Sequence, residues 1–435
     1  MKGGRFHSGP TVVVSAPGRT ARHGAAFEWV LSSALGLDWR WEDDVLAYRE
    51  AEGIRMHYGE ESELPGIAFS AHGLLGQLGS VSADPPNCDG PGFDGFASVF
   101  WMASRMEEFL PQAPRDAHGR FDPVGSISEQ RGWIDVPVCE QWAWRIGERL
   151  LGDAWASHRN RLMAEHVVCP TLDVDSAFAY RGKGFVRTAG AWARDLARGH
   201  WGQARRRLQV ASGGASDPFD TYERVVRLHR ERDLETTWFF LMAKFGRFDK
   251  GLPPGSATLA SLMQGLERTE GHSVGWHPGH AAASDERTMT LEHSAFSAVM
   301  GQTPTASRQH YLRLVPSVTR RNLIRLGVLH DHTEGHAART GWRGGFARTR
   351  PWYDLEREEL TPLQLCPFAA MDATFMRYLQ ASPGDVPGRI SQLTSESRKW
   401  GAPLRLLWHN ESLSGEGQWK GWEGVYSKTL DAACG

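Results

Sequence analysis

Beyond residue 160, short apolar runs alternate with helical stretches, and this alternation sets the predicted fold. Residues 166–175 (HVVCPTLDVD) and 404–410 (LRLLWHN) are mainly apolar runs of strand length. Residues 221–233 (TYERVVRLHRERD) and 258–269 (TLASLMQGLERT) place apolar residues at helical spacing. Strands that alternate with helices are typical of a parallel α/β domain. We therefore expect an α/β barrel over residues 161–435, with chemistry at the carboxyl ends of its strands.

The first 160 residues show a mixed pattern that predicts a smaller α/β domain. Residues 27–37 have helical character, residues 43–59 suggest alternating strands, and residues 99–110 place apolar side chains at helical spacing. The polar stretch 153–161 (DAWASHRNR) follows and is the candidate linker. We therefore expect two domains, residues 1–160 and 161–435, which is an ordinary division for a chain of 435 residues.

Composition narrows the classes of partner. Apolar residues make up 41% of the chain and charged residues 23%, and the formal net charge of -2 creates no global field that would attract nucleic acid or anionic lipid. No apolar stretch approaches the length of a membrane span or of a signal-peptide core, so we expect a cytoplasmic protein without a transmembrane segment. The five cysteines are widely spaced and lack a C-x-x-C pair, which predicts reduced thiols.

Two carboxylates end the strand predicted at residues 166–175. Asp173 and Asp175 are two residues apart, so on an extended strand their side chains point to the same face. Neighbouring carboxylates repel each other, and a bound cation or a shared proton relieves the repulsion. A second interpretation stays open, in which a strand-end aspartate caps the start of the next helix.

Three histidines fall within residues 271–280 (GHSVGWHPGH). His277 and His280 follow a predicted strand, and the Pro-Gly pair between them forces a turn that could bring both rings to one ion. His272, at the start of that strand, we interpret as structural. One aspartate with two histidines leaves coordination positions open, as hydrolytic metal sites require. Zinc is the metal we expect first, before cobalt, nickel or manganese.

These motifs resemble those of the polysaccharide deacetylases, the NodB homology family or carbohydrate esterase family 4 in the broad sense. Residues 171–175 (TLDVD) are similar to its T-F-D-D-G motif, and GHSVGWHPGH is similar to its histidine motif. The resemblance implies a distorted (β/α) barrel, with Asp173 as catalytic base and with Asp175 and His277 as metal ligands. Where the family has its second histidine ligand this chain has Ala281, so His280, one place earlier, is the expected third ligand.

The same resemblance suggests roles for later residues. His409 ends a late strand and takes the place of the histidine that protonates the leaving group, while Arg308 and Asp331 hold the base and the acid in their charge states. As isolated residues, Arg308 and Asp331 would more often be ordinary salt-bridge partners. The chain has 18 tryptophans, and either core packing or platforms for sugar rings would account for them. The expected substrate-binding residues are Trp276, Arg343 and Trp408.

The N-terminal region is similar, through residues 104–121 (SRMEEFLPQAPRDAHGRF), to the domain that precedes a divergent subgroup of these deacetylases. The resemblance implies no function for that domain. Glu107, Glu108 and His118 could form a second site, but a helix with a solvated acidic face is the interpretation we favour.

The sequence thus predicts a metal-dependent hydrolase that removes acetyl groups from N-acetylated sugars of a polysaccharide or a glycan precursor. Because the histidine expected at position 281 is missing, a catalytically degenerate carbohydrate-binding protein is the main alternative. A C–N hydrolase that acts on a small non-sugar amide is a further one.

Overall fold

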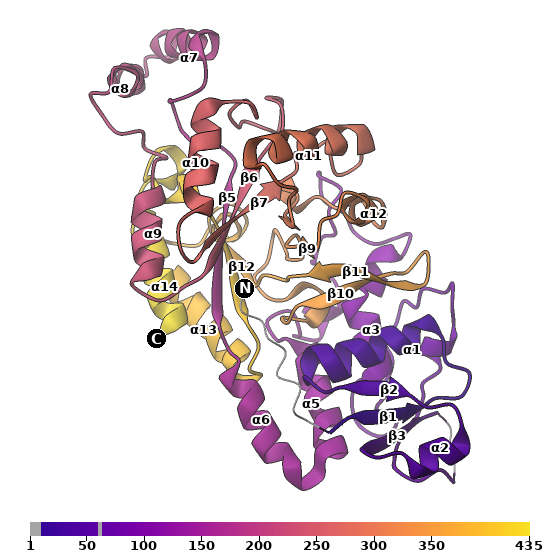
Figure 1. The fold of residues 1–435 in the computed structure, drawn as a ribbon. Coiled ribbons are helices and arrows are strands. Elements are labelled where there is room, and N and C mark those ends of the chain that lie inside the picture. The colour runs from indigo at the N-terminus through magenta and orange to yellow at the C-terminus, as the bar shows by residue number, and fades with distance from the viewer. Residues whose placement is uncertain (1–9, 60–62) are drawn as a thin grey trace. The chain divides into compact units, whose positions relative to one another are not determined.

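The computed structural model describes residues 10–59 and 63–435, and the chain divides into two compact units (Figure 1). The first unit comprises Met1–Val167, Glu334–Ala369 and Leu393–Leu404. The second comprises Val168–Thr333, Ala370–Gln392 and Arg405–Gly435. The sequence predicted a single domain boundary near residue 160, followed by an uninterrupted second domain. Instead, the chain returns to the first unit twice after leaving it.

The first unit is built on a parallel sheet with the strand order β2-β1-β3-β4. Its strands are β1 (Val12–Ser15), β2 (Trp39–Trp41), β3 (Ile54–Tyr58) and β4 (Ile67–Phe69). Its longer helical elements are α1 (Ala21–Phe27), η1 (Glu28–Ala34), α2 (Val45–Glu50), α3 (Gly95–Ala103), α4 (Ile127–Gln130), α5 (Val138–Leu151) and α6 (Trp155–Ala164). Short helical turns are η2 (Leu74–Gly76), η3 (Met106–Phe109), η4 (Gly152–Ala154) and η6 (Arg343–Gly345).

Two local predictions in this unit are replaced by helices. The first half of residues 43–59 forms α2 rather than a strand, because the Asp44 side chain accepts a hydrogen bond from the Ala47 backbone N–H and caps the helix. The stretch expected to be a linker forms η4 and most of α6. Trp155 and Leu162 lie two turns apart on α6 and both are buried in the core of the unit.

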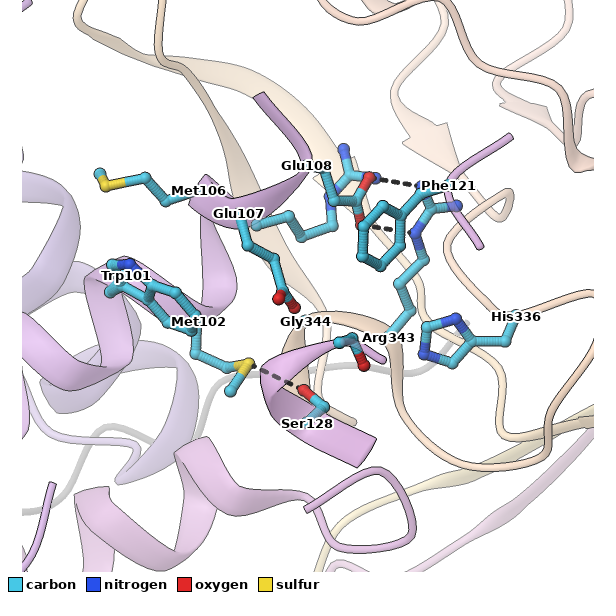
Figure 2. A pocket seen from close by; sticks show the side chains of 12 residues that line it. Trp101, Met102, Met106, Glu107, Glu108, Phe121, Ser128, His336, Arg343 and Gly344 are labelled. Atoms are coloured by element: carbon cyan, nitrogen blue, oxygen red, sulfur yellow. Dashed lines mark hydrogen bonds and ion pairs between the residues drawn. The ribbon is translucent and has the colours of Figure 1, made fainter. Parts of the chain in front are cut away.

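Buried ion pairs hold the returning segment 334–369 within the first unit. The Arg343 guanidinium donates to both carboxylate oxygens of Glu108, at 2.8 and 2.6 Å (Figure 2). Arg350 donates to Glu334 at 2.5 Å, and both of these side chains are fully buried. Arg350 begins the antiparallel hairpin of β10 (Arg350–Asp354) and β11 (Glu359–Leu365). Buried charges require partners, and these pairs supply them, while Phe346, Tyr353 and Leu355 of the same segment join the hydrophobic core of the unit.

The acidic residues of the motif around position 107 are therefore not a solvated face. Glu108 is 6% exposed, and the pKa of its carboxyl is lowered to about 2, because Arg105 and Arg343 outweigh the effect of burial. Glu107 accepts a hydrogen bond from the Ile127 backbone N–H at 3.0 Å, and burial raises its pKa. Both carboxylates serve the packing of η3 against its neighbours.

The second unit is built on a parallel sheet whose strands follow the order β9-β8-β7-β6-β5-β13-β12. Its strands are β5 (Val168–Val174), β6 (Thr236–Leu241), β7 (His272–His277), β8 (Ala306–Ser307), β9 (His330–Asp331), β12 (Ala370–Met371) and β13 (Leu404–His409). The helices between and after them are α7 (Phe185–Ala197), α8 (Trp201–Ala211), α9 (Tyr222–Arg230), α10 (Ala257–Glu267), α11 (Glu286–Met300), α12 (Val318–Arg325), α13 (Val386–Lys399) and α14 (Val425–Cys434). Only the first half of α13, to Gln392, belongs to this unit. Short helical turns are η5 (His310–Leu312), η7 (Thr374–Tyr378), η8 (Asn410–Leu413) and η9 (Gly417–Trp419).

The mixed α/β class with a large parallel sheet is confirmed, whereas a closed barrel is not found. Among residues 10–59 and 63–435, no strand pairing closes the sheet on itself. Strands β8, β9 and β12 have two residues each, so the outer parts of the sheet offer few backbone groups for pairing. Within the part of the chain that the structure describes, no helix is both long and apolar enough to cross a membrane.

Strand register brings the carboxyl ends of this sheet together. Leu241 pairs with His277, and Trp276 pairs with Ser307, so the residues after β6, β7 and β8 leave the sheet at one edge. Ligands bind at this edge in open parallel sheets.

Candidate metal centre

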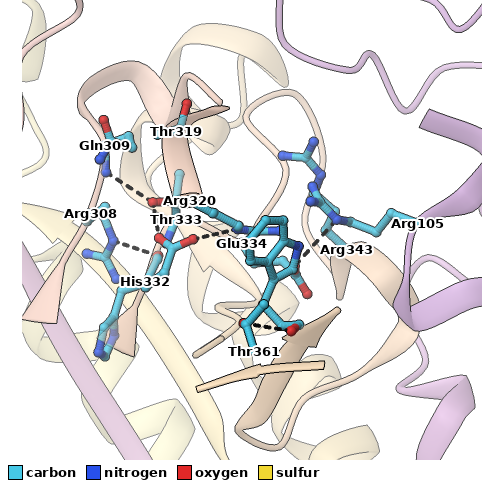
Figure 3. Close-up of polar contacts among 12 residues, drawn as sticks. Arg105, Arg308, Gln309, Thr319, Arg320, His332, Thr333, Glu334, Arg343 and Thr361 are labelled. Atoms are coloured by element: carbon cyan, nitrogen blue, oxygen red, sulfur yellow. Dashed lines mark hydrogen bonds and ion pairs between the residues drawn. The ribbon is translucent and has the colours of Figure 1, made fainter. Parts of the chain in front are cut away.

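Two aspartates stand at the end of β5. Asp173 is the penultimate residue of the strand and is 3% exposed, and Asp175 is the first residue beyond it. Arg308, which follows β8, donates to Asp173 Oδ1 at 2.8 Å and to Thr171 Oγ1 at 2.9 Å. Its Nε also donates to the His332 carbonyl at 3.0 Å, as Figure 3 shows. The guanidinium therefore holds one oxygen of Asp173 in place, and the other faces His277 at 3.7 Å.

His277 ends β7 and presents one ring nitrogen to both aspartates. Its Nδ1 donates to the Arg308 carbonyl, which can only accept, so the neutral ring carries its lone pair on Nε2. This nitrogen lies 3.2 Å from Asp175 Oδ1, and both atoms are buried without a hydrogen-bond partner. Two acceptors that face each other require a proton or a cation between them.

His310 supplies a third donor atom to this group. Its Nε2 lies 3.2 Å from Asp175 Oδ2, and its Nδ1 donates to Asp249 Oδ1 at 2.7 Å. The ligand atoms of Asp175, His277 and His310 all lie within 4.8 Å of one another. One carboxylate and two imidazoles form a donor set for zinc and similar divalent metals. The carboxylate behind His310 is the usual means of orienting a ligand histidine.

The charges of these residues depend on one another. Burial alone would raise the pKa of Asp175, but His310 and His277 hold it well below its usual range. Burial would likewise lower the pKa of His310, yet Asp175 and Asp249 raise it to about 9. A positive charge is therefore stabilised beside Asp175, and a proton or a divalent cation can provide it.

His409, the last residue of β13, forms a pair with Asp372, which follows β12. Its Nδ1 donates to Asp372 Oδ1 at 2.7 Å, and its backbone N–H donates to Oδ2 at 2.8 Å. The other ring nitrogen points to Asp175 Oδ2 at 3.9 Å. Burial opposes protonation, but Asp372 outweighs it and raises the pKa of His409 to about 10. The ring can therefore carry a proton toward the centre.

The structure does not bring His280 to this group, although the sequence placed the third ligand there. The backbone N–H of His280 donates to Asp249 Oδ1 at 3.0 Å, and its ring stacks on Phe248 with 4.0 Å between centroids. The Pro-Gly turn thus directs the side chain toward Phe248. The place expected for His280 is taken by His310.

Asp331 also forms contacts other than the one expected for it. It accepts from Arg320 Nε at 2.9 Å and from the backbone and hydroxyl of Thr333, and it is fully buried. These bonds hold the turn after β9. Arg308 and Asp331 were expected to hold the base and the acid in their charge states. Of these two, Arg308 is the one that contacts Asp173, the expected base.

The three expected substrate-binding residues are all buried. Trp276 and Trp408 are 0% and 1% exposed, so neither offers a face on which a sugar ring could stack. Arg343 pairs with Glu108 inside the first unit. His272 accepts from Trp238 Nε1 at 2.9 Å, the structural role expected for it.

Sequence reasoning missed two members of the centre. His310 stands two residues after Arg308, but β8 ends at Ser307 and His310 begins a helical turn, so strand alternation could not assign its side chain to the face of Arg308. Asp249 lies in the loop after β6, where no local pattern distinguishes it.

The fold and these side chains together define an α/β protein with a candidate three-ligand metal centre. Residues 12–153, less than half of the chain, match a family of unknown function, DUF7033. No curated protein matches the chain. A solved structure described as a polysaccharide deacetylase from Mycobacterium smegmatis is 15% identical, with a TM-score of 0.37, and the match covers 62% of this chain and 85% of that one. The structure of Puue allantoinase is 11% identical, with the same TM-score of 0.37 and the same coverage of 62% and 85%.

Proposed function

We propose that this protein is a metal-dependent hydrolase that removes acetyl groups from N-acetylated sugars of a polysaccharide or a glycan precursor. The observation that carries the proposal is the convergence of Asp175, His277 and His310 on one point, with Asp173 and His409 beside it. The residue motifs that resemble the deacetylase family support the choice of acetylated sugars.

The donor set fits a divalent cation, because buried acceptor atoms of Asp175 and His277 face each other without a hydrogen bond. Asp175, His277 and His310 would hold the ion, with zinc as the first candidate. When bound, the ion would supply Lewis acidity, the property that lowers the pKa of water and polarises an acyl carbonyl.

The remaining residues move protons. Asp173, fixed by Arg308 through one oxygen, accepts a proton from the attacking water through the other. His409, held by Asp372, donates the proton that the departing nitrogen needs, since an amine anion is a poor leaving group.

Two structural features bear on the two alternative functions, a degenerate binding protein and a hydrolase of small amides. His310 completes the three-ligand group, so the missing histidine at position 281 no longer argues for a degenerate binding protein. The burial of Trp276 and Trp408 favours a small non-sugar amide as the second candidate substrate, because such a substrate needs no stacking platform.

The decisive experiment measures bound metal and acetate release from N-acetylated oligosaccharides for the wild type and Asp173→Asn. We expect one divalent ion per chain in both proteins and a loss of turnover of at least about 100-fold in the variant. Asp233→Asn is the matched control: this aspartate is exposed and has a φ of 53°, which asparagine also tolerates.

Full activity of Asp173→Asn would contradict the assigned base. A wild type that binds metal but releases acetate from none of the sugars, while it hydrolyses simple amides, would favour the second candidate.

A further inference from the structure

The connection between β5 and β6 carries a pair of helices, α7 and α8, with a concentration of positive charge. Residues 181–208 contain eight lysine and arginine residues against the single acid Asp195, in a chain whose net charge is -2. Figure 1 shows both helices extending away from strands β5, β6 and β7. The charge is therefore a local feature of this helical pair.

Acidic side chains neutralise only part of this charge, since Asp220 lies 3.4 Å from Arg181 and Glu416 lies 3.7 Å from Arg206. Asp195 accepts from Arg207 at 2.9 and 3.2 Å, and this arginine is 9% exposed, so the pair ties α7 to α8. Arg194, Arg198 and Arg205 are exposed, and no acidic side chain of residues 10–59 and 63–435 forms an ion pair with them. Their charge faces solvent.

Large apolar side chains are exposed on the same two helices. Val186 is 83% exposed, Trp201 is 68% exposed and Leu208 is 54% exposed. On α8, Trp201, Arg205 and Leu208 have the spacing i, i+4 and i+7, which places them on one face. This face of α8 presents two apolar side chains and a positive charge together, and a long arginine side chain can extend past apolar neighbours to reach the headgroup level of a membrane interface.

We propose that α7 and α8 form a docking surface for an anionic lipid bilayer. Arginine side chains meet the headgroup charge, while Trp201, Leu208 and Val186 enter the boundary between headgroups and acyl chains. A nucleic acid would satisfy the arginines but offers no apolar layer for leucine and valine.

The surface lies on the same connection as the metal centre, since Asp175 is the first residue after β5. Docking would thus hold the β5–β6 connection at a membrane, where lipid-linked substrates are found. The proposal concerns binding alone and does not depend on the proposed hydrolysis.

The test is co-sedimentation of the full chain with vesicles. We expect binding to phosphatidylcholine–phosphatidylglycerol vesicles, weakening with added salt, and none to pure phosphatidylcholine vesicles. The charge reversal Arg194→Glu, Arg198→Glu and Arg205→Glu should weaken binding at least about tenfold. The control Arg159→Glu, Arg230→Glu and Arg287→Glu changes the same charge at exposed positions elsewhere and should bind as the wild type does.

A second variant separates a bilayer from other polyanions. Val186→Ser, Trp201→Ser and Leu208→Ser keep every charge, and all three side chains are exposed, so the fold should persist. We expect this variant to lose vesicle binding as well. Absence of wild-type binding, equal loss in the control, or unchanged binding of the serine variant would overturn the proposal. Tight binding of single-stranded RNA that the serine variant retains, without vesicle binding, would assign the surface to nucleic acid instead.

Discussion

At the scale of single residues, the candidate centre depends on which histidine nitrogens face Asp175. His277 donates its Nδ1 proton to the Arg308 carbonyl and His310 donates its own to Asp249, so in the neutral rings both Nε2 atoms offer lone pairs to one point. His280 is close in sequence, but its ring lies on Phe248. Proximity along the chain therefore does not decide which residue can bind an ion.

His310→Ala and His280→Ala form a matched pair that tests this assignment. We expect His310→Ala to lose metal affinity by at least about tenfold, because one of three protein ligands is removed. His280→Ala should keep the wild-type metal content. Metal titration of the stripped proteins, followed by calorimetry, measures both. Equal metal affinity in the two variants would contradict the role of His310.

At the scale of elements, a stretch rich in polar residues can still form a helix with a buried face. The stretch around α6 is rich in polar residues, which made it look like a linker, yet Trp155 and Leu162 enter the core of the first unit. Two buried apolar residues, one near each end of α6, are too few to show a helical periodicity in the sequence.

Leu162→Ala and Met163→Ala test whether α6 is part of the folded core. Leu162 is 2% exposed and its neighbour Met163 is 42% exposed, so the two variants remove side chains of similar size from opposite environments. We expect Leu162→Ala to lower the free energy of unfolding by about 2–5 kcal/mol and Met163→Ala by less than about 0.5 kcal/mol. Urea unfolding provides the measurement. A flexible linker would instead give small effects in both.

At the scale of the whole molecule, residues far apart in the sequence form one unit through buried charges. Glu108 binds Arg343, and Glu334 binds Arg350, so the segment 334–369 belongs with the N-terminal residues. Glu108 has a folded-state pKa of about 2, below its ordinary value of 4.5. Its ionised form is therefore favoured by folding, and this contribution is present above the ordinary value and lost as the pH falls toward 2.

Glu108→Gln should show this pH dependence directly. At pH 7 the substitution leaves Arg343 without its charged partner, and we expect the free energy of unfolding to fall by about 3–5 kcal/mol. As the pH falls through 4.5 toward 2, the wild-type carboxylate takes up a proton and the difference between the two proteins should shrink. Thermal unfolding across this range measures it. A difference that stays constant with pH would show that the charge of Glu108 is not what stabilises the fold.

The sequence by itself determined the features that local periodicity encodes. Strands β5, β7 and β13 and helices α9 and α10 lie where the apolar patterns predicted them, and Asp173 and Asp175 stand together because residues two apart share a face of a strand. Tertiary structure alone decided that His310 rather than His280 faces Asp175, that Asp249 stands behind it, and that residues 334–369 return to the first unit. Each of these depends on contacts between distant parts of the chain, such as the pairing of Arg343 with Glu108, and no local pattern records which buried charge will find which partner.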